Sequence, residues 1–127
     1  MSGAKFLLDA NSVFYLLQGK LSHFKNNLSL DEIAISIITR MEFLSNNDLG
    51  EKDKYLFENF LKGITVFYIA PPDEKLIKET VRIRKKYKLT LPDAIIASTA
   101  LLNDLILISA DAVFSKIFNL KFQLIKT

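Results

Sequence analysis

The stretch LPDAIIASTALLNDLILISADAVF, residues 91–114, decides the fold of this 127-residue chain. Its first half is apolar at helical spacing after a proline, which predicts a helix over Pro92–Leu102. The polar pair Asn103-Asp104 separates this helix from the run Leu105–Ile108, which is predicted to be a strand. Because that run is apolar throughout, it is typical of a strand that is covered on both faces of a sheet.

Short apolar runs alternate with helical patterns over the rest of the chain. The other predicted strands are Lys5–Leu8, Ile33–Ser36, Ile64–Ile69 and Phe122–Ile125. The other predicted helices are Ser12–Leu17, Leu21–Lys25, Thr39–Ser45, Glu51–Lys62, Asp73–Tyr87 and Ala112–Phe118. Strands separated by helices favour parallel pairing through crossovers. We therefore expect one domain over residues 1–127, a three-layer α/β/α sandwich with a central, mostly parallel five-stranded sheet.

The composition excludes several classes of protein. Half of the residues are hydrophobic, which is enough for a real core. No apolar run approaches the roughly 20 residues of a membrane-spanning helix, and the residues after Lys5 do not resemble a secretory signal. The absence of cysteine excludes a disulfide framework and a thiolate zinc site. We expect a cytoplasmic protein with no membrane partner.

Four acidic residues stand directly against apolar runs, where carboxylates are rare: Asp9, Glu42, Asp93 and Asp111. Asp9 and Asp111 follow predicted strands, so they belong to the sheet edge at which ligands bind in open α/β folds. Glu42 follows a strand by about one helical turn, and Asp93 opens its helix on the buried stripe. A buried carboxylate is costly unless a cation or a hydrogen-bond network compensates it. With one histidine and no cysteine as competing ligands, the four acids suit Mg²⁺ or Mn²⁺.

Each of these acids also has a purely structural interpretation as a helix cap. Thr90 and Asp93 have the spacing of a capping box, with Pro92 in the first turn. Thr39 and Glu42 have the same spacing. The two acids that follow strands can each cap the helix after them. Taken singly, a cap explains each acid as well as a ligand does, but four acids at one sheet edge are harder to explain as independent caps.

A basic cluster lies at the end of the predicted helix Asp73–Tyr87. Five of the seven residues from 82 to 88 are cations: Arg82, Arg84, Lys85, Lys86 and Lys88. Cations near the negative end of a helix dipole explain this cluster, and a phosphate-binding patch is the alternative. The net charge of +3 permits nucleic-acid binding without requiring it. We interpret His23 as a surface residue.

Three blocks of the sequence together resemble the PIN domain family, and in particular its single-domain toxins of the VapC type. FLLDANSVFYLL, residues 6–17, resembles the opening strand and helix of that family, and ISIITRMEFL, residues 35–44, resembles its second segment. Residues 91–114 resemble its third block. The order and spacing of the blocks match over nearly the whole chain. One departure is Ala110, where many relatives carry Asn or Arg.

This resemblance implies a single PIN domain that acts as a Mg²⁺- or Mn²⁺-dependent endoribonuclease, the toxin of a toxin–antitoxin pair. It implies that the four acids form the catalytic quartet, with Asn11, Thr39 and Ser109 as polar supports. It also implies an RNA substrate, a small antitoxin as partner and a homodimer. The ten Phe and four Tyr residues further predict an apolar surface that a partner covers, with Phe14, Tyr15 and Phe24 as candidates.

The chemistry of the carboxylates supports RNA cleavage independently of the resemblance. A hard cation lowers the pKa of a bound water and neutralises charge on the phosphate. Asp9 and Asp93 are the expected direct ligands, whereas Glu42 and Asp111 either bind a second ion or orient the attacking water. A phosphoacceptor or phosphatase α/β domain is a competing function, but it needs a second acid close to Asp9, where residue 11 is Asn. The other alternative is a non-catalytic PIN-like module that binds RNA or protein.

Overall fold

A computed structural model describes residues 3–20, 29–71 and 73–126, and its centre is a parallel five-stranded sheet. The strands are β1 (Phe6–Leu8), β2 (Ile33–Ser36), β3 (Thr65–Phe67), β4 (Ile106–Ser109) and β5 (Phe122–Leu124). They lie in the order β3-β2-β1-β4-β5, and every neighbouring pair is parallel. The predicted fold class is therefore confirmed. The predicted helix Leu21–Lys25, with His23 and Phe24, lies outside the described residues.

Five α-helices and two 3₁₀-helices surround the sheet in the described part of the chain. They are α1 (Ala10–Leu17), α3 (Ile37–Leu44), α4 (Glu51–Leu61), α5 (Glu74–Tyr87), α6 (Leu91–Leu102), η1 (Leu30–Glu32) and η2 (Ala112–Lys116). The prediction of a helix over Ala112–Phe118 was too long, because the segment is a five-residue 3₁₀-helix whose C-cap is Ile117. The sequence did not predict η1. No helix in the described ranges is long and apolar enough to cross a membrane.

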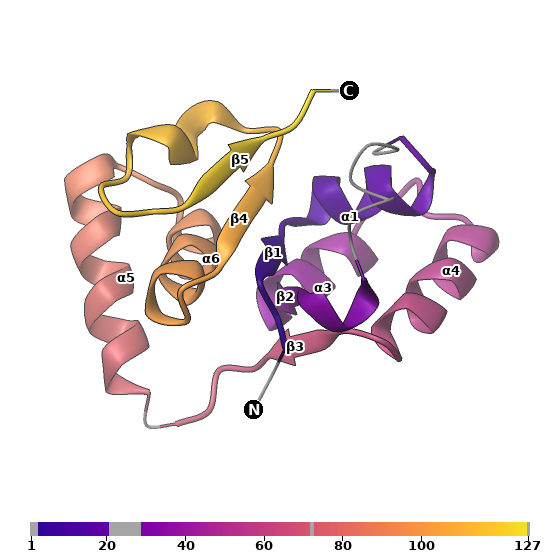
Figure 1. Cartoon of the computed structure of the whole chain (residues 1–127), viewed down its shortest axis with the longest axis horizontal. Helices are drawn as coiled ribbons and strands as arrows, with labels where there is room; N and C mark the ends of the chain where they lie inside the picture. Colours follow the sequence, from indigo (N-terminus) through magenta and orange to yellow (C-terminus); the bar gives the residue numbers. More distant parts are fainter. Residues whose placement is uncertain (1–2, 21–28, 72, 127) are drawn as a thin grey trace.

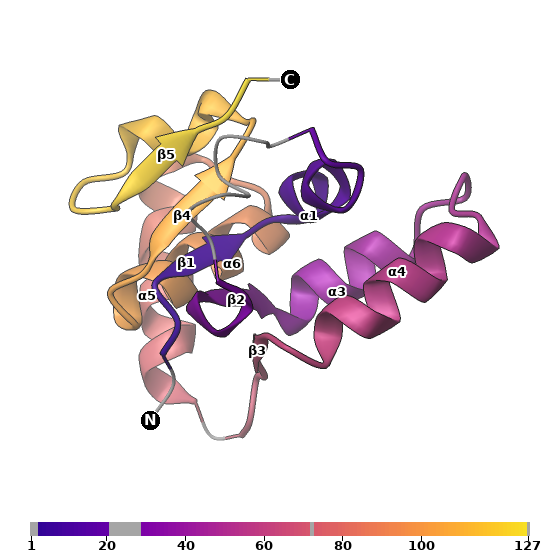
Figure 2. The same ribbon diagram turned by 45° about the vertical axis from the view of Figure 1, so that its right-hand side comes forward.

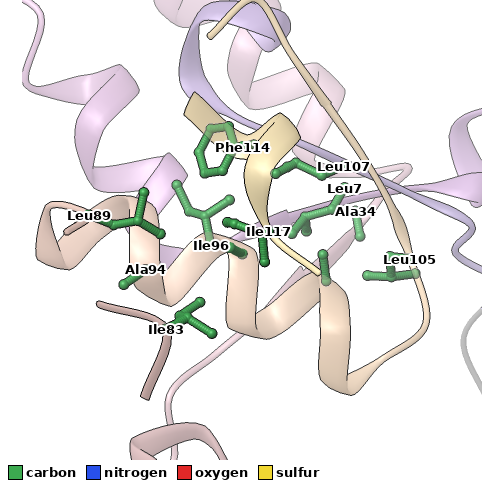
Figure 3. Packing of buried hydrophobic residues seen from close by; sticks show 12 residues of the cluster. Leu7, Ala34, Ile83, Leu89, Ala94, Ile96, Leu105, Leu107, Phe114 and Ile117 are labelled. Carbon is green, nitrogen blue, oxygen red and sulfur yellow. The ribbon is translucent and has the colours of Figure 1, made fainter. Parts of the chain in front are cut away.

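Alternating side chains of the strands serve the two faces of the sheet. Leu7 and Leu107 pack against α5 and α6, together with Ile96 of α6 and the buried Phe114 of η2 (Figure 3). Their neighbours Leu8 and Ile108 belong to a second cluster on the opposite face. Figures 1 and 2 show the resulting layers, with α5 and α6 on one side of the sheet and α1, α3 and α4 on the other.

Aromatic rings fill much of the second face. Phe43 of α3 stacks on Phe57 of α4 with ring centroids 4.1 Å apart, and Phe60 lies 6.4 Å from Phe57. Phe57 is completely buried. Burial of such a ring stabilises a fold by several kcal/mol, since truncation of a buried Phe to Ala typically costs about 3–5 kcal/mol. These contacts hold α3, which bears Glu42, against the sheet.

The order in which the strands are added to the sheet reverses between β1 and β4, although all strands run in the same direction. Strands β1, β2 and β3 follow one another toward one edge, whereas β4 and β5 lie on the other side of β1. Such a switch point leaves a crevice beyond the carboxyl ends of the two central strands, where ligands bind in open α/β sheets. Asp9 directly follows β1 at this point, and Asp111 lies two residues after the end of β4.

Candidate active site

Asp9 is both the cap of α1 and the centre of a hydrogen-bond network at the switch point. Its Oδ1 accepts a hydrogen bond from the backbone N–H of Ser12 at 3.0 Å, which caps the helix. Its Oδ2 accepts from the Ser109 hydroxyl at 2.5 Å, across the gap between β1 and β4. The Ser12 hydroxyl donates to the carbonyl of Ile108 at 2.8 Å. The Asp9 side chain therefore caps α1 with one oxygen and takes part in the hydrogen-bond network of the site with the other.

Ser109 joins Asp9 to the second strand-end acid, Asp111. The Ser109 oxygen accepts a hydrogen bond from the backbone N–H of Asp111 at 3.0 Å, while its own proton is donated to Asp9. Asp111 in turn caps η2, because its Oδ1 accepts from the N–H of Val113 at 2.9 Å. Ser109 is completely buried, so this single hydroxyl fixes the relative position of two exposed or half-exposed carboxylates.

Asp93 lies in the first turn of α6, one turn after the cap residue Thr90. The Thr90 hydroxyl accepts a hydrogen bond from the N–H of Asp93 at 3.3 Å, and Pro92 follows the rule that proline favours the first helical turn. The cap proposed for this helix is thus present through the Thr90 side chain. The Asp93 side chain is left half-buried and lines the pocket described below.

Glu42 reaches the site from α3, but not through the predicted cap. The N-cap of α3 is Ser36, whose hydroxyl accepts from the N–H of Ile38 at 3.1 Å. The interpretation of Thr39 and Glu42 as a capping box is therefore wrong, because the helix already begins at Ile37 and both residues lie inside it. Thr39 is completely buried, and its hydroxyl has no hydrogen-bond partner in the described part of the chain.

One pocket of about 260 Å³ brings the four acids together. Its lining comprises Asp9, Ala10, Asn11, Glu42, Asp93, Ile96, Asp111 and Phe114. The structure thus assembles all four sequence-selected acids with Asn11, and it places Ser109 behind Asp9. Thr39 does not line this pocket. A neighbouring hollow of about 210 Å³ shares Asn11 and Glu42 and extends along Phe14 and Tyr15.

The carboxylates repel one another, and partial burial adds to the cost of ionising two of them. Desolvation, followed by the charges of Asp93 and Asp9, raises the pKa of Glu42 above its usual value. Desolvation also raises the pKa of Asp93, with smaller contributions from Asp111 and Asp9, while a hydrogen bond from Thr90 opposes the rise. The ion pairs of the described residues involve four other acids, namely Glu32, Glu51, Glu79 and Asp104. The pocket therefore carries negative charge that no side chain described here neutralises.

The donor set of this pocket fits a hard divalent cation. Every polar side chain that lines it offers oxygen, from four carboxylates and the Asn11 amide, and none offers sulfur or imidazole nitrogen. Within the described residues, no three acids converge closely enough to hold one ion together. That spacing suits Mg²⁺, which keeps several of its waters and takes only one or two protein carboxylates. We therefore assign any ion here to at most two of the four acids directly.

Two contributors to the site were missed at the level of sequence. Ser12 ties α1 to β4 through its bond to the Ile108 carbonyl, and Ser36 sets the start of α3. Both are small polar residues beside apolar stretches: Ser36 stands at the boundary between β2 and α3, and Ser12 lies in the first turn of α1. That position was the available signal, because a buried hydroxyl must find a partner. The apolar lining from Ile96 and Phe114 carries no comparable signal, since such residues look like ordinary core.

The fold and the pocket define a class: parallel α/β proteins with an acidic site at the switch point of the sheet. The family model of the PIN domain matches residues 6–119. The chain belongs to the PIN domain family.

Solved structures share this fold. A toxin–antitoxin complex from Klebsiella pneumoniae contains a chain that is 26% identical, with 94% of this chain and 96% of that chain covered and a TM-score of 0.75. VapBC2 from Rickettsia felis, bound to a DNA fragment from its promoter, is 21% identical, with coverage of 95% and 98% and a TM-score of 0.78. DNA-bound VapBC from Salmonella typhimurium is 22% identical, with coverage of 94% and 97% and a TM-score of 0.75. Among curated proteins, none matches the chain significantly.

Proposed function

We propose that this protein is a metal-dependent endoribonuclease and the toxin of a toxin–antitoxin pair of the VapC type. The observation that carries the proposal is the meeting of four carboxylates, from four separate segments of the chain, in one pocket that lacks a compensating cation among the described residues. PIN domains are generally nucleases, which supports the reaction class. The toxin role is supported by the 26% identical chain in the Klebsiella pneumoniae toxin–antitoxin complex.

In this proposal Asp9 and Asp93 hold Mg²⁺ or Mn²⁺, and Asp111 holds a second ion or orients the attacking water. When bound, the ion supplies an acidified water and neutralises charge on the phosphate. Ser109 and the N–H of Ser12 fix both oxygens of Asp9, so its carboxylate is oriented before a substrate arrives. Glu42 is the base best suited to accept the proton of the attacking water, because its raised pKa brings it closer to neutral pH. The expected products are a 5′-phosphate and a 3′-hydroxyl.

The partners in this proposal are an RNA substrate, a small antitoxin and a second copy of the chain, in the cytoplasm. An uncovered apolar surface on α5, α6 and the segment after β3 supports the homodimer. Ile69, Ile77, Val81 and Leu91 are 45–52% exposed there, and an apolar hollow of about 220 Å³ lies between them. Two-fold pairs are the commonest way to cover such a surface. Phe14 and Tyr15, the candidates that the sequence suggested, are partly buried in the second core cluster, and Phe24 lies outside the described residues.

The test is cleavage of single-stranded and structured RNA by the purified protein in Mn²⁺, in Mg²⁺ and in EDTA. We expect cleavage with either metal and none in EDTA. Asp93→Asn should lose most activity, whereas Asp48→Asn, an identical change at an exposed acid outside the pocket, should retain it. Equal cleavage in EDTA, or by Asp93→Asn, would refute the mechanism.

A non-catalytic module that binds RNA or protein is the second candidate function. The absence of any three converging acids among the described residues is the observation in its favour. The same assay separates the two functions, because a binding module retains RNA without cleaving it at any metal concentration.

A further inference from the structure

Three cations of the basic cluster line one hollow at the carboxyl end of α5. Arg84, Lys85 and Lys88 surround a depression of about 420 Å³, whose remaining lining is Thr80, Val81, Leu89 and Leu91. Val81 and Leu91 also line the apolar hollow assigned to the homodimer, so this depression lies at the rim of that surface, and none of the three cations lines the apolar hollow. All three cations are exposed. The ion pairs of the described residues use Lys5, Lys54, Arg82 and Lys121, and none uses these three. The hollow therefore presents positive charge that the protein itself leaves uncompensated.

Lys88 occupies a backbone position that a lysine fills at a cost. It ends α5 in the left-handed conformation, with φ 56° and ψ 45°. Glycine or asparagine is the usual residue at such a helix end, because a side chain with a Cβ is disfavoured there. The helix dipole explains a preference for cations in the last turn, but it does not explain a lysine at this strained position. Local departures of this kind concentrate at functional sites.

The basic hollow and the acidic pocket adjoin the same turn of α6. Leu91 lines the hollow, and Asp93, two residues later, lines the pocket. Two residues correspond to about 3 Å along a helix axis, and side chains two apart do not face each other, so the two sites lie on different sides of the first turn of α6. An acidic pocket alone repels the phosphates of a nucleic acid, so a substrate needs cations close to the site but not inside it. The end of α5 supplies them there.

We propose that this hollow binds phosphate groups of the RNA strand beside the phosphodiester that enters the acidic pocket. The inference rests on the proposed function for the identity of the polyanion. Phe118 favours RNA over an acidic peptide: its side chain is 72% exposed, and its N–H donates to the Tyr87 hydroxyl at 3.0 Å, which holds it at the same end of α5. Figure 1 shows the segment after η2 beside that end of the helix. Exposed aromatic rings beside cations are the usual platform for unpaired bases.

The test is binding of a fluorescent single-stranded RNA in EDTA, measured by anisotropy over a range of salt concentrations. Wild type is compared with Lys85→Gln/Lys88→Gln and with the charge-matched control Lys75→Gln/Lys78→Gln at the other end of α5. We expect the first pair to weaken binding and to reduce the slope of log K against log[salt] by about 0.7 for each phosphate that the protein no longer neutralises. The control should change neither. Phe118→Ala should weaken binding about tenfold without changing the slope.

Lys88→Gly excludes a trivial loss of folding. It should raise the melting midpoint, because glycine fits the left-handed position, and still weaken RNA binding. Equal slopes for the two lysine pairs would overturn the proposal, and so would unchanged RNA binding accompanied by loss of a protein partner. Because EDTA prevents metal-dependent cleavage, binding that depends on Lys85 and Lys88 supports the hollow even if the protein proves not to cleave RNA. If wild type cleaves RNA and Lys85→Gln/Lys88→Gln binds RNA as tightly as wild type, the proposed role of the hollow is refuted while the proposed function stands.

Discussion

Replacement of Ser109 by Ala should destabilise the protein through a single hydroxyl. That hydroxyl donates to Asp9 Oδ2 and accepts from the N–H of Asp111, and it is completely buried between β1 and β4. A hydrogen bond to a charged group contributes about 1.5–3 kcal/mol to stability, and a neutral bond contributes about 0.5–1.5 kcal/mol. The sum is about 2–4.5 kcal/mol. For a domain of this length, this corresponds to a fall in melting midpoint on the order of 10 °C.

The assay is urea unfolding in EDTA, with Ser115→Ala as the matched control. The Ser115 hydroxyl donates to the carbonyl of Ala112 from an exposed position, so its loss should cost less than about 0.5 kcal/mol. A double-mutant cycle with Asp9→Ala isolates the bond between the two side chains. We expect a coupling energy above about 1 kcal/mol. Additivity within about 0.5 kcal/mol would show that Ser109 does not act through Asp9, and the network described for the site would be wrong.

Three further outcomes follow from the same geometry. In EDTA the free energy of unfolding should rise as pH falls from neutral toward about 4, because the pKa values of Glu42 and Asp93 are raised in the folded state. Protonation of these two groups therefore favours the fold. Urea midpoints that fall steadily as pH is lowered across this range would contradict the prediction. Asp93→Asn should melt at or above the wild-type temperature in EDTA. It should also lose the stabilisation of about 1.4 kcal/mol that Mn²⁺ at ten times its Kd gives wild type. A melting midpoint in EDTA far below that of wild type would make Asp93 chiefly a structural residue of α6. Phe57→Ala should cost about 3–5 kcal/mol by urea unfolding, since the ring is completely buried against Phe43, and a cost below about 1 kcal/mol would show that α4 is not held by this stack.

The strands were predictable because short, continuous apolar runs are typical of strands that are covered on both faces of a sheet. The residues at which the strands begin and end were less predictable. Leu105 was predicted to open β4, but its N–H bonds to the carbonyl of Ala100 and closes α6, so the strand begins at Ile106. The edge strand β3 keeps only Thr65–Phe67 of the predicted run. The first shift comes from a backbone hydrogen bond at the end of the preceding helix, and element ends of this kind are not encoded by local composition.

The choice among competing cap residues also escaped the sequence. Ser36 and Thr39 are both of types that cap helices, with serine somewhat favoured, and the end of β2 places Ser36 at the boundary. By contrast, the four acids were identifiable because each interrupts an apolar run. What the sequence could not supply is their spacing: they share one pocket, yet no three of them converge on a single point among the described residues.

The central claim is that these carboxylates act as one cation-binding unit. Titration of the metal-free protein with Mn²⁺, followed by electron paramagnetic resonance of the free ion, tests it most directly. Saturable binding should occur in wild type and in Asp48→Asn, and it should be lost in Asp9→Asn, which keeps an oxygen to cap α1 but removes the charge at the centre of the pocket. Equal binding by Asp9→Asn and wild type, or no saturable binding by either, would contradict the account.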